Sequence, residues 1–171
     1  MLIPFTIYSG DSFGAICKDV TSATEIILAI QEIQKHQRSR FVLIEDEITY
    51  GMEQKNFLTL EGPALWKSEE KLTIIKKKKQ LFLADLNNEL LTKTVNTIVN
   101  FILAVRNDWN EQEWTIYKNY TPEVKQQDLA EDMGITQQYV SKIIGQSKLR
   151  LIREAEENLK SIIDGINSNI H

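Results

Sequence analysis

Polar and basic side chains that could read DNA gather in one short segment of the sequence. Residues 136–150 contain three basic side chains, Lys142, Lys148 and Arg150, and no acidic one. A glutamine can make two hydrogen bonds to adenine, Ser and Thr can bond bases or phosphates, and Lys and Arg can neutralise phosphates. The chemistry is that of double-stranded DNA binding. The candidate DNA-binding residues are Gln126, Thr136, Gln137, Gln138, Tyr139, Ser141, Lys142, Lys148 and Arg150.

Two short helices would have to position these side chains. The pattern predicts helices over residues 123–133 and 136–144, joined by a turn at Gly134. Ala130 is small enough for the second helix to cross close over the first, and Gly134 can take the positive φ that ends the first helix. Thr136 is a good N-cap. The shared core would be Leu129, Met133, Ile135, Val140, Ile143 and Ile144. The arrangement is typical of a helix-turn-helix, although the same hairpin could serve protein contact or simple packing.

The rest of the C-terminal unit, residues 111–171, is also helical by pattern. A helix is expected over 111–120 and another from Lys148 onward, which makes four helices in this unit. Apolar residues on the last helix recur at intervals of three and four: Ile152, Ala155, Leu159, Ile162 and Ile166. The stripe spans about two heptads, so packing back on the same chain and dimerisation are both open.

The N-terminal unit, residues 1–86, reads as α+β. Ile3 to Tyr8 and Phe13 to Cys17 are predicted to form a hairpin around a turn at 9–12. A helix over 22–37 and a buried strand over 41–44 follow. Further elements are expected at 63–76, where Pro63 suits the first turn of a helix, and at 81–83, where a short strand fits.

A connecting segment, 87–110, contains a long amphipathic helix ending near Arg106. Its apolar face is Leu91, Val95, Ile98 and Ile102, with Leu90, Val99 and Leu103 beside or behind it. The apolar arc exceeds the roughly 100° that one small domain covers, so two packing partners are expected. A second subunit is one candidate, and a homodimer would also place two helix-turn-helix units on two half-sites of DNA.

Composition excludes several classes of protein. The chain has 171 residues, a net charge of −4 and a single cysteine, Cys17, and no apolar run long enough to span a membrane. Its two histidines, His36 and His171, lie far apart with no ligand-like spacing, so neither a metal nor another cofactor is expected. The first residues show no signal-peptide pattern, and we expect a cytoplasmic protein.

The order of several short motifs resembles the SatD family, a bacterial group that joins an N-terminal domain to a C-terminal helix-turn-helix. The motifs are residues 9–13 after a strand, 41–51, 61–66 opening a helix, and 109–144. The hairpin also resembles nucleotidyl cyclases and GGDEF-type domains, which implies a ferredoxin-like α+β sheet.

The cyclase resemblance is incomplete at the positions that hold metal. Those enzymes bind two Mg²⁺ through carboxylates on an earlier strand and on the hairpin. Here the chain starts at the first hairpin strand, and Ser12 stands where the second hairpin acid would be, which leaves Asp11 alone. The resemblance therefore implies a degenerate domain that senses a signal or mediates assembly and is not an enzyme.

We expect a DNA-binding transcriptional regulator whose N-terminal unit dimerises or senses an unknown small-molecule or protein signal. Two hypotheses compete with it. One is a nucleotide-binding or catalytic cyclase-like domain with the helix-turn-helix as an accessory. The other is an adaptor that binds another protein through the same helices.

Overall fold

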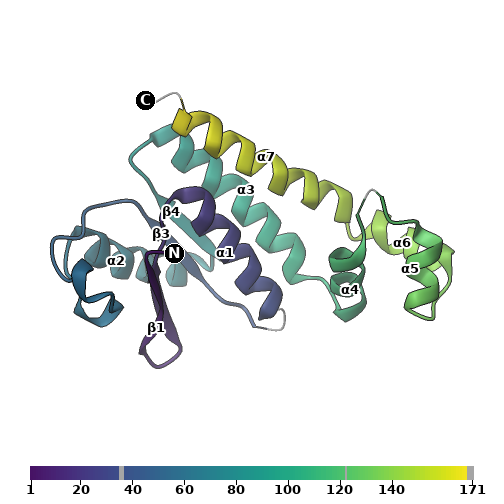
Figure 1. Cartoon of the computed structure of the whole chain (residues 1–171), viewed down its shortest axis with the longest axis horizontal. Coiled ribbons are helices and arrows are strands. Elements are labelled where there is room, and N and C mark those ends of the chain that lie inside the picture. The colour runs from purple at the N-terminus through teal and green to yellow at the C-terminus, as the bar shows by residue number, and fades with distance from the viewer. Residues whose placement is uncertain (35–36, 122, 169–171) are drawn as a thin grey trace.

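The chain folds into a mixed α and β structure in which helices predominate. The computed structural model describes residues 1–34, 37–121 and 123–168 (Figure 1). In chain order the elements are β1 (Ile3–Ser9), β2 (Ser12–Ile16), α1 (Val20–Ile33), β3 (Phe41–Ile44), the one-turn helices η1 (Met52–Gln54) and η2 (Phe57–Thr59), α2 (Pro63–Lys78), β4 (Phe82–Asp85), α3 (Glu89–Asn107), α4 (Glu111–Asn119), α5 (Gln126–Asp132), α6 (Gln137–Gln146) and α7 (Leu149–Ser168). Every helix and strand expected from the sequence is present.

The helix boundaries follow local capping and turn chemistry. α1 begins at Val20 because the Asp19 carboxylate accepts a hydrogen bond from the Ser22 amide at 2.7 Å. The helix expected over 22–37 ends at Ile33, and residues 35–36 lie outside the described part of the chain. The helix expected from residue 123 begins only at Gln126, and ahead of it the Val124 amide donates to the Thr121 carbonyl at 3.1 Å. The expected start at Pro122 also lies outside the described residues.

In the described part of the chain the four strands form two separate sheets, which corrects the expectation of one ferredoxin-like sheet. β1 and β2 pair as the predicted antiparallel hairpin. β3 and β4 pair in parallel, with Phe41 opposite Phe82 and Ile44 opposite Asp85, and α2 makes the crossover between them. β2 and β3 do not pair with each other. The connection through α1 therefore joins two strands that lie in different sheets.

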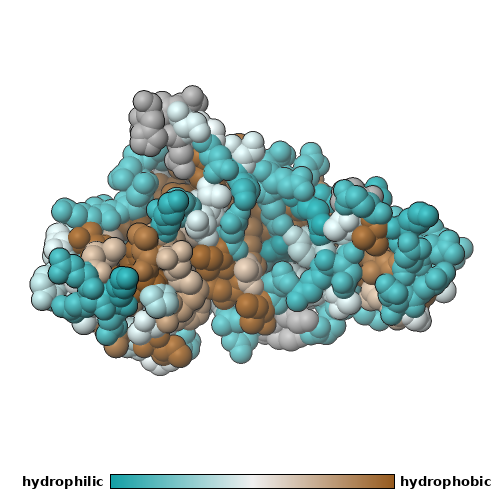
Figure 2. Space-filling model, viewed as in Figure 1, coloured by the Kyte–Doolittle hydropathy of each residue, from teal (hydrophilic) through white to brown (hydrophobic). Residues whose placement is uncertain are grey.

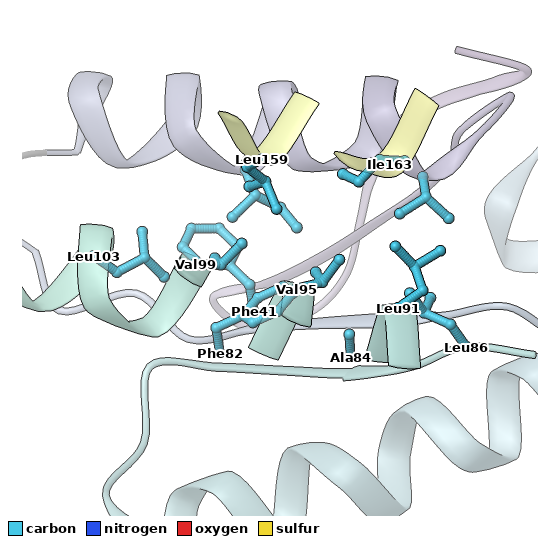
Figure 3. Close-up of a cluster of buried hydrophobic side chains, with 12 residues drawn as sticks. Phe41, Phe82, Ala84, Leu86, Leu91, Val95, Val99, Leu103, Leu159 and Ile163 are labelled. Atoms are coloured by element: carbon cyan, nitrogen blue, oxygen red, sulfur yellow. The ribbon is translucent and has the colours of Figure 1, made fainter. Parts of the chain in front are cut away.

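The main core lies between the β3–β4 sheet, α3 and α7. Figure 3 shows Leu159 and Ile163 of α7 pointing toward α3, and Phe82 and Ala84 of β4 on the other side of the same cluster. Leu159 and Ile163 are at most 2% exposed. The C-terminal stripe thus packs back on its own chain. Ile162, which the heptad pattern placed in this stripe, is 38% exposed, and Ile163 takes its place.

Most of the wide apolar face of α3 is covered within the chain, although Leu90 is 68% exposed. Leu91, Val95, Val99 and Leu103 are all at most 2% exposed, and they belong to the same core cluster as residues of β4, α1 and α7. One molecule therefore supplies both packing partners that the sequence predicts for α3. The breadth of this face thus does not by itself require a second subunit, because α7 supplies the second partner.

Polar residues of α3 close the outer edge of β4. The Asn96 side chain accepts from the Ala84 amide at 2.7 Å and donates to the Ala84 carbonyl at 2.8 Å. Asn100 does the same for Phe82, at 3.2 and 2.9 Å. One helical turn before Asn96, the Thr92 hydroxyl meets the amide and carbonyl of Leu86. Side chains four residues apart thus replace a neighbouring strand.

Loss of either asparagine should weaken the fold. Asn96→Ala or Asn100→Ala leaves an amide and a carbonyl of β4 without partners, and we expect the free energy of unfolding to fall by about 1–3 kcal/mol. Urea unfolding at neutral pH measures the change. Thr97→Ala, on the exposed face of the same helix, is the matched control and should change stability by less than about 0.5 kcal/mol. Asparagine variants as stable as this control would contradict the role assigned to the two amides.

Candidate nucleic-acid interface

Helices α5 and α6 meet across a tight turn at one end of the molecule (Figure 1). Gly134 has a φ of +65° and its amide donates to the Glu131 carbonyl at 3.1 Å, while the Ile135 amide donates to the Ala130 carbonyl at 2.9 Å. These two bonds form the Schellman motif that ends α5. Ala130 is 3% exposed in the core that α5 shares with α6. The small residue and the glycine therefore have the structural roles expected from the sequence.

α6 has one buried and one exposed face. Val140, Ile143 and Ile144 are at most 6% exposed and pack into the C-terminal core cluster. The expected N-cap is confirmed, because the Thr136 side chain accepts a hydrogen bond from the Tyr139 amide at 3.2 Å. The exposed face carries Gln137, Gln138, Ser141, Lys142 and Gly145. It is polar, contains one cation and contains no carboxylate.

The remaining candidates lie around this face, and two of them are held by hydrogen bonds. The Tyr139 hydroxyl donates to the Gln112 side chain of α4 at 2.6 Å. Arg150 Nε donates to the Tyr120 hydroxyl at 3.0 Å, and its guanidinium carbon lies 5.7 Å from the centre of that ring. Lys148 is exposed in the turn before α7, and Gln126 is half-buried at the start of α5. Tyr139 and Arg150 thus also bind α6 and α7 to α4 and its C-terminal end.

Helix α4 fixes the position of α6. Asn110 and Glu113 make a capping box at the start of α4, with the Asn110 side chain accepting from the Glu113 amide and the Glu113 carboxylate accepting from the Asn110 amide. The other carboxylate oxygen of Glu113 accepts from the Ser147 hydroxyl at the end of α6. The indole of Trp109 donates to the Ser147 carbonyl at 3.1 Å. The end of α6 is therefore held by the segment that joins α3 to α4.

A buried ionic cluster connects this segment to the rest of the molecule. Arg106, 3% exposed at the end of α3, pairs with Glu156 of α7 and donates to the Tyr117 hydroxyl of α4 at 2.5 Å. The Tyr117 hydroxyl in turn donates to Glu156. The guanidinium carbon of Arg106 lies 4.7 to 5.9 Å from the centres of the Tyr117, Trp114 and Trp109 rings. We name Arg106, Tyr117 and Glu156 the arginine cluster.

Burial sets the ionisation of the arginine cluster. Desolvation raises the pKa of Tyr117 to about 12, against the lowering influence of Arg106. Desolvation also raises the pKa of the Glu156 carboxyl above its ordinary value, although Arg106 and the Tyr117 hydroxyl act in the opposite direction. The cluster therefore keeps Tyr117 neutral at physiological pH and pairs the guanidinium of Arg106 with the half-buried side chain of Glu156.

Sequence reasoning missed the arginine cluster for a physical reason. Arg106 ends a helix and is followed by polar residues, which is the pattern of an exposed cation near a helix C-terminus. Glu156 stands beside Glu157 on a charged helix, and nothing local distinguishes the buried one from its neighbour. The available signal was the aromatic set of Trp109, Trp114 and Tyr117, which is dense enough to enclose a cation.

Neither Asp11 nor Cys17 belongs to a group of three metal-ligand side chains among the described residues. Asp11 lies exposed in the turn between β1 and β2, and Cys17 is half-buried, with a thiol pKa raised by that burial. Over residues 1–34, 37–121 and 123–168, no three His, Cys, Asp or Glu side chains are grouped to hold a metal ion. Within the same ranges, no helix is long and apolar enough to cross a membrane.

Breaking the arginine cluster at one end should cost more than removing both ends. Arg106→Met leaves Glu156 without its cation, and we expect a loss of about 3–5 kcal/mol in the free energy of unfolding. The double variant Arg106→Met with Glu156→Gln should recover part of that loss, which a double-mutant cycle in urea measures. Lys93→Ala, which breaks an exposed ion pair with Glu89, is the control and should cost no more than about 0.5 kcal/mol. Strict additivity of the two changes would refute the coupling.

Comparison with known proteins connects this architecture to one family. No curated protein and no solved structure shows a significant match to the chain. The family model described as the SatD family matches residues 1–163, which is nearly the whole chain and includes both the N-terminal hairpin and α6. The chain therefore belongs to the SatD family.

Proposed function

We propose that the protein is a DNA-binding transcriptional regulator in which α5 and α6 act as a helix-turn-helix, with α6 entering the major groove. The observation that carries the proposal is the exposed face of α6. It presents glutamine, serine and lysine side chains together and no carboxylate, while the opposite face is buried. Amide and hydroxyl groups can bond base edges, and a cation can pair with phosphate. The first residues of the helix, Gln137 and Gln138, are those that such motifs place against bases.

Charge around α6 favours one side of the helical pair. Asp128, Glu131 and Asp132 lie exposed on α5. Lys142 and Lys148 lie exposed on and just after α6. Neither lysine makes an ion pair within the described part of the chain, so both are free to meet phosphates. DNA would thus approach the α6 side, with α5 meeting it only near Gln126 at its N-terminal end.

The N-terminal unit is proposed to dimerise the protein or to sense a signal, without catalysis. Asp11 alone offers a poor site for the two Mg²⁺ ions of a cyclase. Dimerisation would supply the second half-site that a single helix-turn-helix lacks. Because a regulator of this kind acts on the chromosome, we expect the protein to be cytoplasmic. If the protein binds no DNA, we would conclude that α5 and α6 form an adaptor that binds another protein.

DNA recognition should depend on the exposed face of α6. The full chain is first used to select a preferred DNA sequence from random duplexes. With that sequence as the ligand, Gln137→Ala and Gln138→Ala should each lose about 1–3 kcal/mol of discrimination between the preferred and unrelated DNA. Lys142→Ala should weaken binding to all duplexes and lower the slope of log affinity against log salt by about 1. Fluorescence anisotropy at several salt concentrations measures both effects.

The matched control is Lys93→Ala, which removes one positive charge from the exposed side of α3. It should leave discrimination and the salt slope unchanged. If the three α6 variants all bind like Lys93→Ala, α6 is not the reading helix.

A homodimer should form through the N-terminal hairpin. Ile7 on β1 is 74% exposed, which is unusual for a large apolar side chain in a strand. We expect light scattering at micromolar concentration to give twice the chain mass of 19.8 kDa and Ile7→Asp to give monomers. Ile33→Asp, at the end of α1 and 80% exposed, is the control and should remain dimeric. A monomeric unmodified protein would exclude the dimer.

A further inference from the structure

Cations gather at the end of the β3–β4 pair where both strands begin. Residues 37–44 contain two arginines and no acidic residue, and residues 71–84 contain five lysines and no acidic residue. The side chains of Arg38, Arg40 and Lys76–Lys79 are all exposed, and none of them makes an ion pair with another described residue. The concentration is local, since the whole chain has a net charge of −4. We name these six residues the basic edge.

The topology of the chain brings the two halves of the basic edge together. β3 and β4 are parallel, so the residues that precede each strand meet at the same end of the pair. The Phe41 amide donates to the Leu81 carbonyl at 2.8 Å. α2 ends with three lysines, and Lys79, with a φ of +55°, turns the chain from α2 toward β4. The lysines thus lie beside the arginines that precede β3.

The surface next to the basic edge is hollowed. Lys78 and Lys79 line an open groove of about 640 Å³ together with Thr97 of α3. A row of exposed cations beside an open groove suits a polymer of phosphates, because such a polymer repeats its negative charge along its length. Lys and Arg are also the side chains that most often contact the phosphates of DNA.

The basic edge lies on the side of the N-terminal unit that faces α4. The Ser39 hydroxyl donates to the Gln34 side chain at 2.5 Å, which holds the segment with the two arginines beside the end of α1. Glu32, on the last turn of α1, pairs with Lys118 of α4 at 2.9 Å. Figure 1 shows the end of α1 directed toward α4. The same helix α4 contacts α6 through Gln112.

These contacts set the distance between the basic edge and α6. Six residues of α4 separate Lys118 from Gln112 and span about 9 Å. With roughly 10 Å for each side-chain contact at its two ends, the basic edge lies on the order of 30–40 Å from α6. One helical turn of duplex DNA is about 34 Å long. Figure 2 shows mostly hydrophilic surface from the end of α1 to α5 and α6, whereas apolar residues gather at the lower left, over the hairpin.

We propose that the basic edge binds the phosphate backbone of the duplex DNA that flanks the sequence contacted by α6, about one helical turn away. The proposal rests on the proposed function of α5 and α6. Phosphate contacts carry no base information, so the basic edge adds affinity and leaves sequence preference to α6. The N-terminal unit is then itself a DNA-binding surface, with its lysines and arginines on one backbone.

Two duplexes of different length test the proposal on the full chain. The short duplex contains only the preferred sequence found by selection, and the long duplex adds about twelve unrelated base pairs on each side, slightly more than one helical turn. We expect the unmodified chain to bind the long duplex about tenfold or more tightly at low salt. The double variant Arg38→Gln with Lys76→Gln should lose most of this gain. Its slope of log affinity against log salt on the long duplex should fall by about 2 for each bound chain.

The matched control is the double variant Lys18→Gln with Lys55→Gln. Both lysines are exposed and lie outside the basic edge, Lys18 ahead of α1 and Lys55 after η1. This variant removes the same charge and should keep the gain from the longer duplex. Equal losses in the two double variants would overturn the proposal, because the effect would then follow net charge alone. Lys142→Ala should weaken binding to both lengths alike.

The outcomes separate this inference from the function on which it rests. Equal affinity of the unmodified chain for the two lengths would overturn the role of the basic edge and leave that of α6 intact. Failure to bind either duplex would overturn both. If duplex length has no effect and polyglutamate binds the unmodified chain but not the Arg38→Gln, Lys76→Gln variant, the basic edge takes an acidic protein and the proposal is wrong.

Discussion

The closure of β4 by side-chain amides constrains the whole structure. Asn96 and Asn100 can each meet an amide and a carbonyl of β4 only if α3 runs alongside the strand with residues four apart in step with alternate strand residues. That placement determines which side chains of α3 face the core. Val95 and Val99 then turn into the core that α7 covers, and Arg106 at the end of the helix reaches α4 and α7. The position of α6 depends on this chain of contacts.

The sequence predicted the elements well because each has a local cause. Pro63, Gly134 and Thr136 mark helix ends through backbone chemistry that acts within a few residues. The same local causes explain why the shared core of α5 and α6 could be named in advance. Leu129 and Val140 are both buried as expected. The DNA-binding role assigned to the exposed residues remains a prediction, because an exposed polar surface does not show which molecule binds it.

Tertiary partners were harder to predict because the residues that find them look ordinary in sequence. Asn96 and Asn100 have the spacing of a solvated helix face, yet they contact a strand. On α7, a strict heptad points to Ile162, whereas a straight helix has 3.6 residues per turn and drifts from the heptad by about 20° per repeat. The drift brings Ile163 into the core in its place. Nothing in the sequence of β2 or β3 indicates that these two strands do not pair, because both have an apolar face.

The asparagine ladder on α3 also limits how far the sheet can grow. A sheet with two open edges can add copies without end, as fibrils do. In the β3–β4 sheet Asn96 and Asn100 close the outer edge of β4, and in the β1–β2 hairpin Pro4 and an irregular register interrupt β1. Neither of these two edges offers a second copy a regular row of free backbone groups. Addition of copies is thus blocked at both edges, which lowers the tendency of the protein to polymerise.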